Sequence, residues 1–223
     1  MKIQFKQKDD RKAKFSMTGV SYTAANTVRR AVMTYVPSMA VTKVTLYENT
    51  SPLYEEIIAQ RIGLIPMVTD LQTYSLPNEC KCGGKGCGRC EVSMILEKSG
   101  PCAVYSGDIK SQDPKVKPVF DKILITKLGN NQKIKMEMVA SIGLMSEHAK
   151  FQASLCSYKQ TADNEFDFFI ESYNNLTPQE IIETAIETLE VRIKELSDAF
   201  DDKKSASRKV SKRALAKKSP KKK

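Results

Sequence analysis

Four of the chain's six cysteines lie within eleven residues, in the segment CKCGGKGCGRC at positions 80 to 90. They are Cys80, Cys82, Cys87 and Cys90, with the spacing C-x-C-x4-C-x2-C. Four thiolates on so short a loop suit a tetrahedral Zn²⁺ ion, and a site closed by four protein sulfurs leaves no position for water. The spacing therefore predicts one structural zinc ion. An iron-sulfur cluster is the alternative, although the spacing differs from that of ferredoxins, and a loop of inert or redox-active thiols is the third interpretation.

The rest of the composition indicates an intracellular protein. A chain of 223 residues can form one large domain or two smaller ones. No apolar run approaches the ~18 residues of a spanning helix, and the N-terminal MKIQFKQKDDRK lacks the apolar stretch of a signal peptide. We therefore expect a cytoplasmic protein with no membrane contact. In such a reducing compartment, clustered cysteines indicate a metal site rather than disulfides.

The formal net charge of +10 is concentrated at the C-terminal end. Residues 203–223 hold 11 Lys and Arg and no acid, which leaves 25 basic against 26 acidic residues in the first 202. A segment so basic and so poor in apolar residues is expected to be disordered. It is a candidate for nonspecific DNA contact, and a solvated solubilising tail is an equally good interpretation.

Hydrophobic periodicity predicts an α+β protein. KIQFK and AKFSMTG read as a strand hairpin, and EVSMILEK, KILITKL and QKIKMEMVA form a mostly antiparallel sheet region that begins at the cysteine loop. Two further strands are FQASLCSYK and EFDFFIES. Helices are predicted over SYTAANTVRRAVMTYVP and over SPLYEEIIAQRIG, the second with Ser51 as its N-cap and Pro52 in the first helical position.

The longest predicted helix is TPQEIIETAIETLEVRIKELSDAF, which starts with a capping box of Thr177 and Glu180. Its apolar residues recur at intervals of four and three, as in a heptad seam. A seam of this kind can pack on its own domain, but its place as the last folded element favours a partner subunit. The first helix offers a second apolar stripe. The candidate interface residues are Val28, Val32, Ile182, Ile186, Leu189, Ile193, Leu196 and Phe200.

The chain shows no catalytic signature. The single histidine, His148, has no cysteine near it in the sequence and is expected to serve as a hydrogen bonder in a loop or at a strand end. Pairs of acids such as Asp9 and Asp10 are neighbours in a turn and form no plausible dyad. No G-K-[ST] follows the glycines at the spacing of a phosphate-binding loop.

Four segments identify a family. AANTVRRAVMTYVPSMAV, YEEIIAQRIGLIPMVTDL, CAVYSGDIKSQDP and GLMSEHAKFQAS resemble, in this order and spacing, the D-subunit family of archaeal RNA polymerase. That family is the counterpart of the N-terminal domain of bacterial alpha subunits and of the third-largest subunit of eukaryotic polymerase II. The resemblance covers about residues 1–201.

The resemblance implies a dimerisation domain of the alpha-subunit type, made of a sheet and two packed helices, from residues 1–43 and 146–202. A mostly β insert domain of residues 44–145, which carries the metal loop, interrupts it. The family's first and last helices pair with the alpha-like subunit L, here over Tyr22 to Val36 and Pro178 to Phe200. With small subunits N and P, the pair forms the platform on which the large catalytic subunits assemble for transcription.

By the same resemblance, this chain is a non-catalytic subunit of a nucleotidyltransferase, and its active site lies on other subunits. The candidate contacts to a large subunit are Arg29, Arg30, Glu55 and Arg61. The cysteine loop is similar to the zinc loop of the eukaryotic relative. Some archaeal members of the family also carry a ferredoxin-like domain with iron-sulfur clusters, for which this chain is too short.

Two functions of other classes compete with the assembly subunit. The first is a free-standing zinc protein that binds nucleic acid, which the metal loop and the basic tail would suit. The second is an iron-sulfur protein that senses redox conditions. Deleting residues 203–223 should abolish the function of a nucleic-acid-binding protein, whereas an assembly subunit should still assemble. An iron-sulfur protein should show a visible absorbance that bleaches on reduction.

Overall fold

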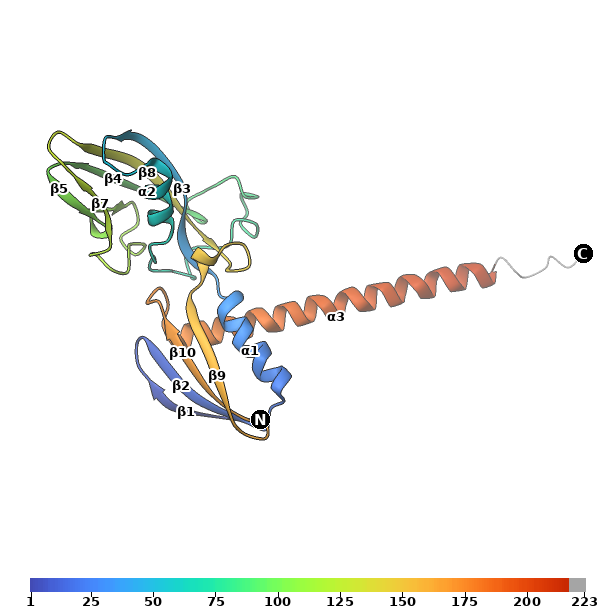
Figure 1. Ribbon diagram of the computed structural model, residues 1–223. Helices are drawn as coiled ribbons and strands as arrows, with labels where there is room; N and C mark the ends of the chain where they lie inside the picture. The colour runs from blue at the N-terminus through green and yellow to red at the C-terminus, as the bar shows by residue number, and fades with distance from the viewer. Residues whose placement is uncertain (217–223) are drawn as a thin grey trace, which may run out of the picture. The chain divides into compact units, whose positions relative to one another are not determined.

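The structure is a computed structural model that describes the backbone of residues 1–216 and the side chains of residues 1–200 (Figure 1). It confirms the α+β class, with two four-stranded sheets, one two-stranded sheet and helices between them. In chain order the elements are β1 (Lys2–Lys8), β2 (Lys12–Thr18), α1 (Tyr22–Thr34), β3 (Ser38–Asn49), α2 (Glu55–Gly63), β4 (Glu91–Ser99), β5 (Cys102–Tyr105), η1 (Ser106–Asp108), β6 (Lys110–Ser111), β7 (Leu124–Leu128), β8 (Lys133–Gly143), η2 (Ala149–Phe151), β9 (Ser154–Ala162), β10 (Glu165–Ser172) and α3 (Pro178–Ala216).

The first sheet joins segments from the two ends of the chain in the order β1-β2-β10-β9. β1 and β2 form the expected hairpin, with Phe5 opposite Phe15. Phe15 in turn lies opposite Phe168 of β10, and the two rings stack with centroids 5.0 Å apart. Because aromatic pairs across neighbouring strands stabilise a sheet, this row joins segments that are distant in the sequence.

Helix α1 packs on β9. Ser21 is its N-cap, since the Oγ atom of Ser21 accepts a hydrogen bond from the backbone nitrogen of Ala24 at 3.2 Å. Ala25, Ala31 and Val32 are the helix residues that are fully buried. Half of the predicted apolar stripe of α1 therefore belongs to the core of this chain.

The second sheet has the order β3-β8-β4-β6 and carries the largest core cluster. The predicted alternation is confirmed, because Ile134, Met136 and Met138 of β8 are buried while their neighbours in sequence are more exposed. Ile58 and Ile62 of α2 are buried in the same cluster. A two-stranded sheet of β5 and β7 completes this region.

Helix α2 begins later than the sequence indicated. It starts at Glu55 after Tyr54, and Ser51 is not its cap. The Oγ and backbone nitrogen of Ser51 both donate to the Oδ1 atom of Asn49 instead, at 2.7 and 3.1 Å. The prediction of the Ser51 cap was wrong because the side chain of Asn49 uses this serine in a local turn.

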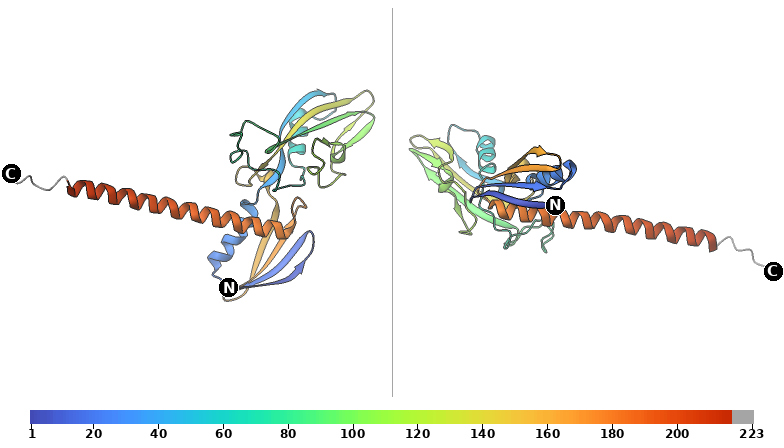
Figure 2. Two further views of the ribbon diagram at one scale, coloured as in Figure 1. Left: turned by 180° about the vertical axis from the view of Figure 1, so that it is seen from behind. Right: turned by 90° about the horizontal axis from the view of Figure 1, so that it is seen from below.

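Helix α3 starts as predicted and runs on beyond Phe200 (Figure 2). The Oε2 atom of Glu180 accepts from the backbone nitrogen of Thr177 at 2.8 Å, and Thr177 Oγ1 accepts from the nitrogen of Glu180 at 3.3 Å. The helix continues to Ala216, into a segment that we expected to be disordered, and residues 203–216 contain no Gly or Pro that would end it. The rest of that segment, residues 217–223, lies outside the described part of the chain.

The chain divides into two compact units, Met1–Ala185 and the remainder of α3 from Ile186 onward. Both four-stranded sheets belong to the first unit. Hydrogen bonds connect segments next to the two sheets: Ser38 Oγ of β3 donates to the carbonyl of Phe151, just before β9, at 2.6 Å, and Thr69 N donates to the carbonyl of Asn175, just after β10, at 3.1 Å. In the described residues, no helix is both long and apolar enough to cross a membrane.

Candidate metal centre and interaction surfaces

The four predicted ligands come together in one cluster. The Sγ atoms of Cys80, Cys82, Cys87 and Cys90 all lie within 4.8 Å of one another. The shortest Sγ to Sγ distances are 3.5 Å between Cys80 and Cys87, 3.6 Å between Cys82 and Cys90, and 3.8 Å between Cys87 and Cys90. Four thiolates at ~2.3 Å from one tetrahedral ion stand about 3.8 Å apart. The donor set and its spacing therefore fit a single ion.

The backbone of the loop holds the sulfurs in place. Cys80 N donates to the carbonyl of Leu76 at 3.0 Å, and Cys90 N donates to that of Cys87 at 3.0 Å. Cys87 N also points at the Sγ atom of Cys90, at 3.3 Å. Such amide contacts orient a thiolate and stabilise its charge. Because Cys90 is followed directly by β4, the loop is anchored to the second sheet.

Glycine is needed at specific points of this loop. Gly83, Gly84 and Gly86 have positive φ, whereas Gly88 does not. Gly86 is also crowded, because a Cβ atom there would lie 2.3 Å from Oε2 of Glu91. A side chain at position 86 would therefore be strained by its backbone and would displace Glu91.

Two thiols of the cluster have shifted pKa values, one lowered and one raised. Hydrogen bonds from Cys82, first from its backbone and then from its side chain, lower the pKa of Cys80 to about 6. Burial raises the pKa of Cys90 to about 12. Without a metal the four groups therefore cannot all be thiolates near pH 7, and a divalent cation supplies the charge that lets them be so.

Side chains outside the loop fix its position. Tyr74, just before the loop, donates from its hydroxyl to the Oδ2 atom of Asp113 at 2.6 Å. Asp70 accepts from Thr73 Oγ1 at 2.8 Å and pairs with Lys115 at 3.4 Å. This group, which we call the Tyr74 clamp, was not predicted. Tyr74 and Asp113 lie 39 positions apart, and Asp70 and Lys115 lie 45 apart, where no local pattern connects them.

The seam residues of α3 differ in exposure along the helix. Ile182 and Leu189 are half-buried, whereas Ile193 is 64% exposed and the two later seam residues are 59% exposed each. Ile186 is 42% exposed. On α1, Val28 is half-buried and Val32 only 1% exposed. Of the predicted interface residues, those free for contact on this chain are Ile186, Ile193, Leu196 and Phe200.

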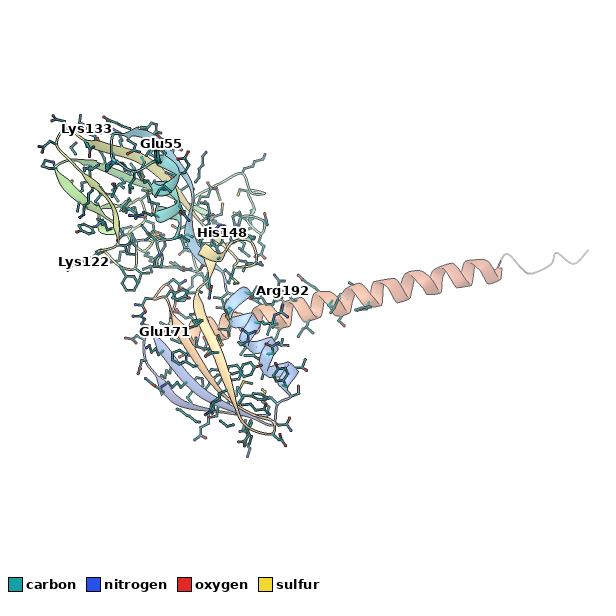
Figure 3. All side chains as sticks on the ribbon, viewed as in Figure 1. Glu55, Lys122, Lys133, His148, Glu171 and Arg192 are labelled. Carbon is teal, nitrogen blue, oxygen red and sulfur yellow. The ribbon has the colours of Figure 1, made fainter. Side chains whose placement is uncertain are left out.

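The four charged residues expected to contact a large subunit have different surroundings. Arg29 is half-buried and donates twice to Asn26 Oδ1, at 3.0 and 3.2 Å. Arg61 donates to the carbonyl of Ile125 at 2.9 Å. Arg61 is nevertheless exposed, as are Arg30 and Glu55. Glu55 lies in the first turn of α2 (Figure 3). Of the four residues, Arg29 is the one that is half-buried.

The two cysteines outside the loop and the histidine have structural roles. Cys156 is buried, and burial raises the pKa of its thiol to about 12, so it behaves as a small hydrophobic residue. Cys102 is half-buried and donates to the carbonyl of Ser99. The Nδ1 atom of His148 accepts from the backbone nitrogen of Lys150 at 3.0 Å and caps η2, which confirms its predicted role as a hydrogen bonder.

Comparison with known proteins gives consistent matches. Residues 43–158 match a family described as the RNA polymerase Rpb3/RpoA insert domain. The chain is 40% identical, over 201 residues, to DNA-directed RNA polymerase subunit Rpo3 of Methanosphaera stadtmanae, covering 86% of this chain and 74% of that protein. It is 45% identical to Rpo3 of Methanosarcina mazei and 42% identical to Rpo3 of Methanopyrus kandleri. The matches cover 71% and 73% of this chain and 60% of each of those two relatives.

Proposed function

Because the chain belongs to the Rpo3 family of archaeal DNA-directed RNA polymerase, which is the D-subunit family, we propose that it is a non-catalytic assembly subunit that pairs with alpha-like subunit L. The observation that carries this proposal is the exposed seam of α3. Four large apolar side chains at heptad spacing, from Ile186 to Phe200, are each more than 40% exposed. A stripe of this kind is typical of an unpaired interface helix.

The size of the seam suits a stable complex. Ile186 and Phe200 are fourteen positions apart in α3, which at 1.5 Å per residue is about 21 Å. If subunit L offers a similar helix, and residues of α1 such as Val28 join the contact, the buried area reaches the ~1,200–2,000 Å² of specific interfaces. Val32 is buried and contributes to the interface indirectly, because it holds α1 against the core of this chain.

On this proposal the chain has the domain organisation of its family. Residues 1–43 and 146–202 form the dimerisation domain, and residues 44–145 form the insert domain. Subunits N and P and the large catalytic subunits bind the pair that this chain forms with L, to complete a cytoplasmic polymerase. Arg30, Glu55 and Arg61, which are exposed, are better candidates than the half-buried Arg29 for contact with a large subunit.

We assign one structural Zn²⁺ to the cysteine loop. The Sγ atoms are all within 4.8 Å of one another, as the four ligands of one tetrahedral ion are. In an iron-sulfur cluster the four thiolates are divided between two irons or among four, so that not all of them share one ion and the set of sulfurs is wider. Cys80, Cys82, Cys87 and Cys90 would hold the ion. It would supply folding energy to a loop that has little apolar core of its own.

Co-expression with subunit L tests the assembly role. We expect a stable 1:1 heterodimer, and a chain that is poorly behaved alone because its seam is exposed. A monodisperse, folded monomer that does not bind L would contradict the proposal. Deleting residues 203–223 should leave the heterodimer intact; loss of all function on that deletion would favour the nucleic-acid-binding alternative.

A further inference from the structure

Two hollows of about 290 Å³ each adjoin on the surface of the first unit, and Leu64 and Lys150 line both. One lies between β3 and the C-terminal end of α2, with His148 on its wall. The other extends toward Phe120 and Tyr173. We call the pair the Leu64 groove. Each hollow is slightly smaller than the ~300–1,000 Å³ of small-molecule pockets, so the volume suits side chains of a peptide segment better than a cofactor.

The floor of the groove is apolar and open. Leu64 is 55% exposed, Phe120 40% and Tyr173 37%, although all three are large apolar residues. Adjoining exposed side chains of this size on a hollowed surface are typical of a binding site for another protein. Among the residues whose side chains are described, none of those in α3 is in the wall of either hollow, so the seam does not account for this surface.

The polar groups of the groove favour a partner that carries negative charge. Neither hollow has an acidic residue in its wall, within the part of the chain whose side chains are described. Lys150 donates a hydrogen bond from one of its three N–H groups to the carbonyl of Val41 at 3.0 Å. His148 accepts at Nδ1, so its neutral ring carries its proton at Nε2 and can donate there. Arg11, at the far end, pairs with Glu171 at 3.4 Å.

Lys150 is also held in a position that suits a carboxylate. Its ammonium lies 5.2 Å from the centroid of the Phe151 ring. Burial lowers the pKa of Lys150, because desolvation disfavours its charged form. A carboxylate beside it would stabilise the charged form and accept from the two remaining N–H groups.

We propose that the Leu64 groove binds an extended segment of another polymerase subunit in which an apolar side chain is flanked by Asp or Glu, an inference that rests on the proposed function. The apolar side chain contacts Leu64 and Phe120, and a carboxylate binds Lys150. The groove includes the end of the segment EEIIAQRIGLIP, to which Leu64 belongs, whereas Lys150 and Phe120 lie outside that segment.

Photo-crosslinking in the reconstituted polymerase tests this site. The photoreactive amino acid p-benzoylphenylalanine is placed at position 64 and, in a separate preparation, at position 193 on the seam. Mass spectrometry identifies the linked peptides. We expect position 193 to link to subunit L, and position 64 to link to an acidic segment of another subunit with an apolar residue at its centre. Lys150→Glu should lower the yield at position 64 at least tenfold and leave position 193 unchanged.

The controls separate the two proposals. Lys150→Met keeps the apolar stem over Phe151, so the same loss of yield with this variant assigns the effect to charge and not to misfolding. A link from position 193 to L with no link from position 64, or with a link from 64 to a segment without carboxylates, overturns the groove and leaves the assembly role standing. Absence of both links overturns the assembly role and the groove with it.

Discussion

The hydroxyl of Tyr74 donates to Oδ2 of Asp113 at 2.6 Å and joins the segment before the metal loop to the turn after β6. Tyr74 is 7% exposed, so the side chain that donates this hydrogen bond is buried in the core. The backbone next to it continues the link, because Ser75 N donates to the carbonyl of Arg89 inside the loop at 3.1 Å. The metal loop is thus fixed to the insert region by the Tyr74 clamp as well as by β4.

Tyr74→Phe should lower the free energy of unfolding by about 1 kcal/mol at pH 7, because a hydrogen bond to a carboxylate is lost. The hydrogen bond from Tyr74 is the largest cause that lowers the pKa of Asp113 below its ordinary 3.8. A lowered pKa gives stability that is present above the unfolded value and is lost as pH falls through the folded one. The difference between wild type and variant should therefore shrink below about pH 4.

Burial, and then the hydrogen bond to Asp113, raise the pKa of Tyr74 from 10.0 to about 12. Stability from this group is complete below pH 10 and is lost as pH rises toward 12. Denaturant titrations from pH 3 to 11 measure both the loss of stability at acid pH, linked to Asp113, and its decline at alkaline pH, linked to Tyr74. Tyr54→Phe is the matched control, since Tyr54 is 80% exposed. Equal stability of the Tyr74 and Tyr54 variants at pH 7 would show that the clamp does not stabilise the fold.

Cys80→Ser should reduce bound zinc from one ion per chain to nearly none, because three thiolates do not close a structural site. Cys102→Ser should leave the metal content unchanged, since Cys102 lies outside the cluster. Elemental mass spectrometry of anaerobically purified protein measures both. Iron with acid-labile sulfide in the wild type would replace the zinc assignment with a cluster, and equal metal in both variants would remove the loop as the site.

Gly86→Ala should weaken zinc binding about tenfold, or by about 1.4 kcal/mol, because an L-residue is strained by that much at positive φ. Gly88→Ala is the matched control. Position 88 does not have positive φ, and a Cβ there meets nothing within 4 Å. Competition with a chromogenic chelator gives the two affinities. The loop geometry is contradicted if alanine is tolerated equally at both positions.

Local patterns predicted most of the fold. The alternation of Ile134, Met136 and Met138 indicated β8 and its buried face, and Thr177 with Glu180 indicated the start of α3. These features depend on neighbours in the chain, which a single sequence displays. The prediction of the Ser51 cap was also based on local pattern, and it was wrong because Asn49, two residues away, accepts the hydrogen bond of this serine.

The parts of the sites that were missed depend on distant residues. Lys150 contacts Val41 across 109 positions, and Tyr74 contacts Asp113 across 39. The stripe of α1 was visible, but the packing of Val32 against β9 was not, since Ser154 reaches its carbonyl only in the fold. Cysteine spacing predicted the cluster of four sulfurs because these residues are neighbours in the sequence.

Affinity for subunit L, measured for a matched pair of variants on α3, tests the central claim most directly. Ile193 lies on the seam and is 64% exposed, whereas Val191 lies off the seam and is 57% exposed, so aspartate at either position leaves the core of this chain intact. We expect Ile193→Asp to weaken the heterodimer about a hundredfold, or by about 2.8 kcal/mol, because it places a charge in an apolar interface. Val191→Asp should stay within about threefold of wild type, a change of less than ~0.7 kcal/mol. Equal affinities for the two variants would contradict the assignment of this seam as the surface that binds L.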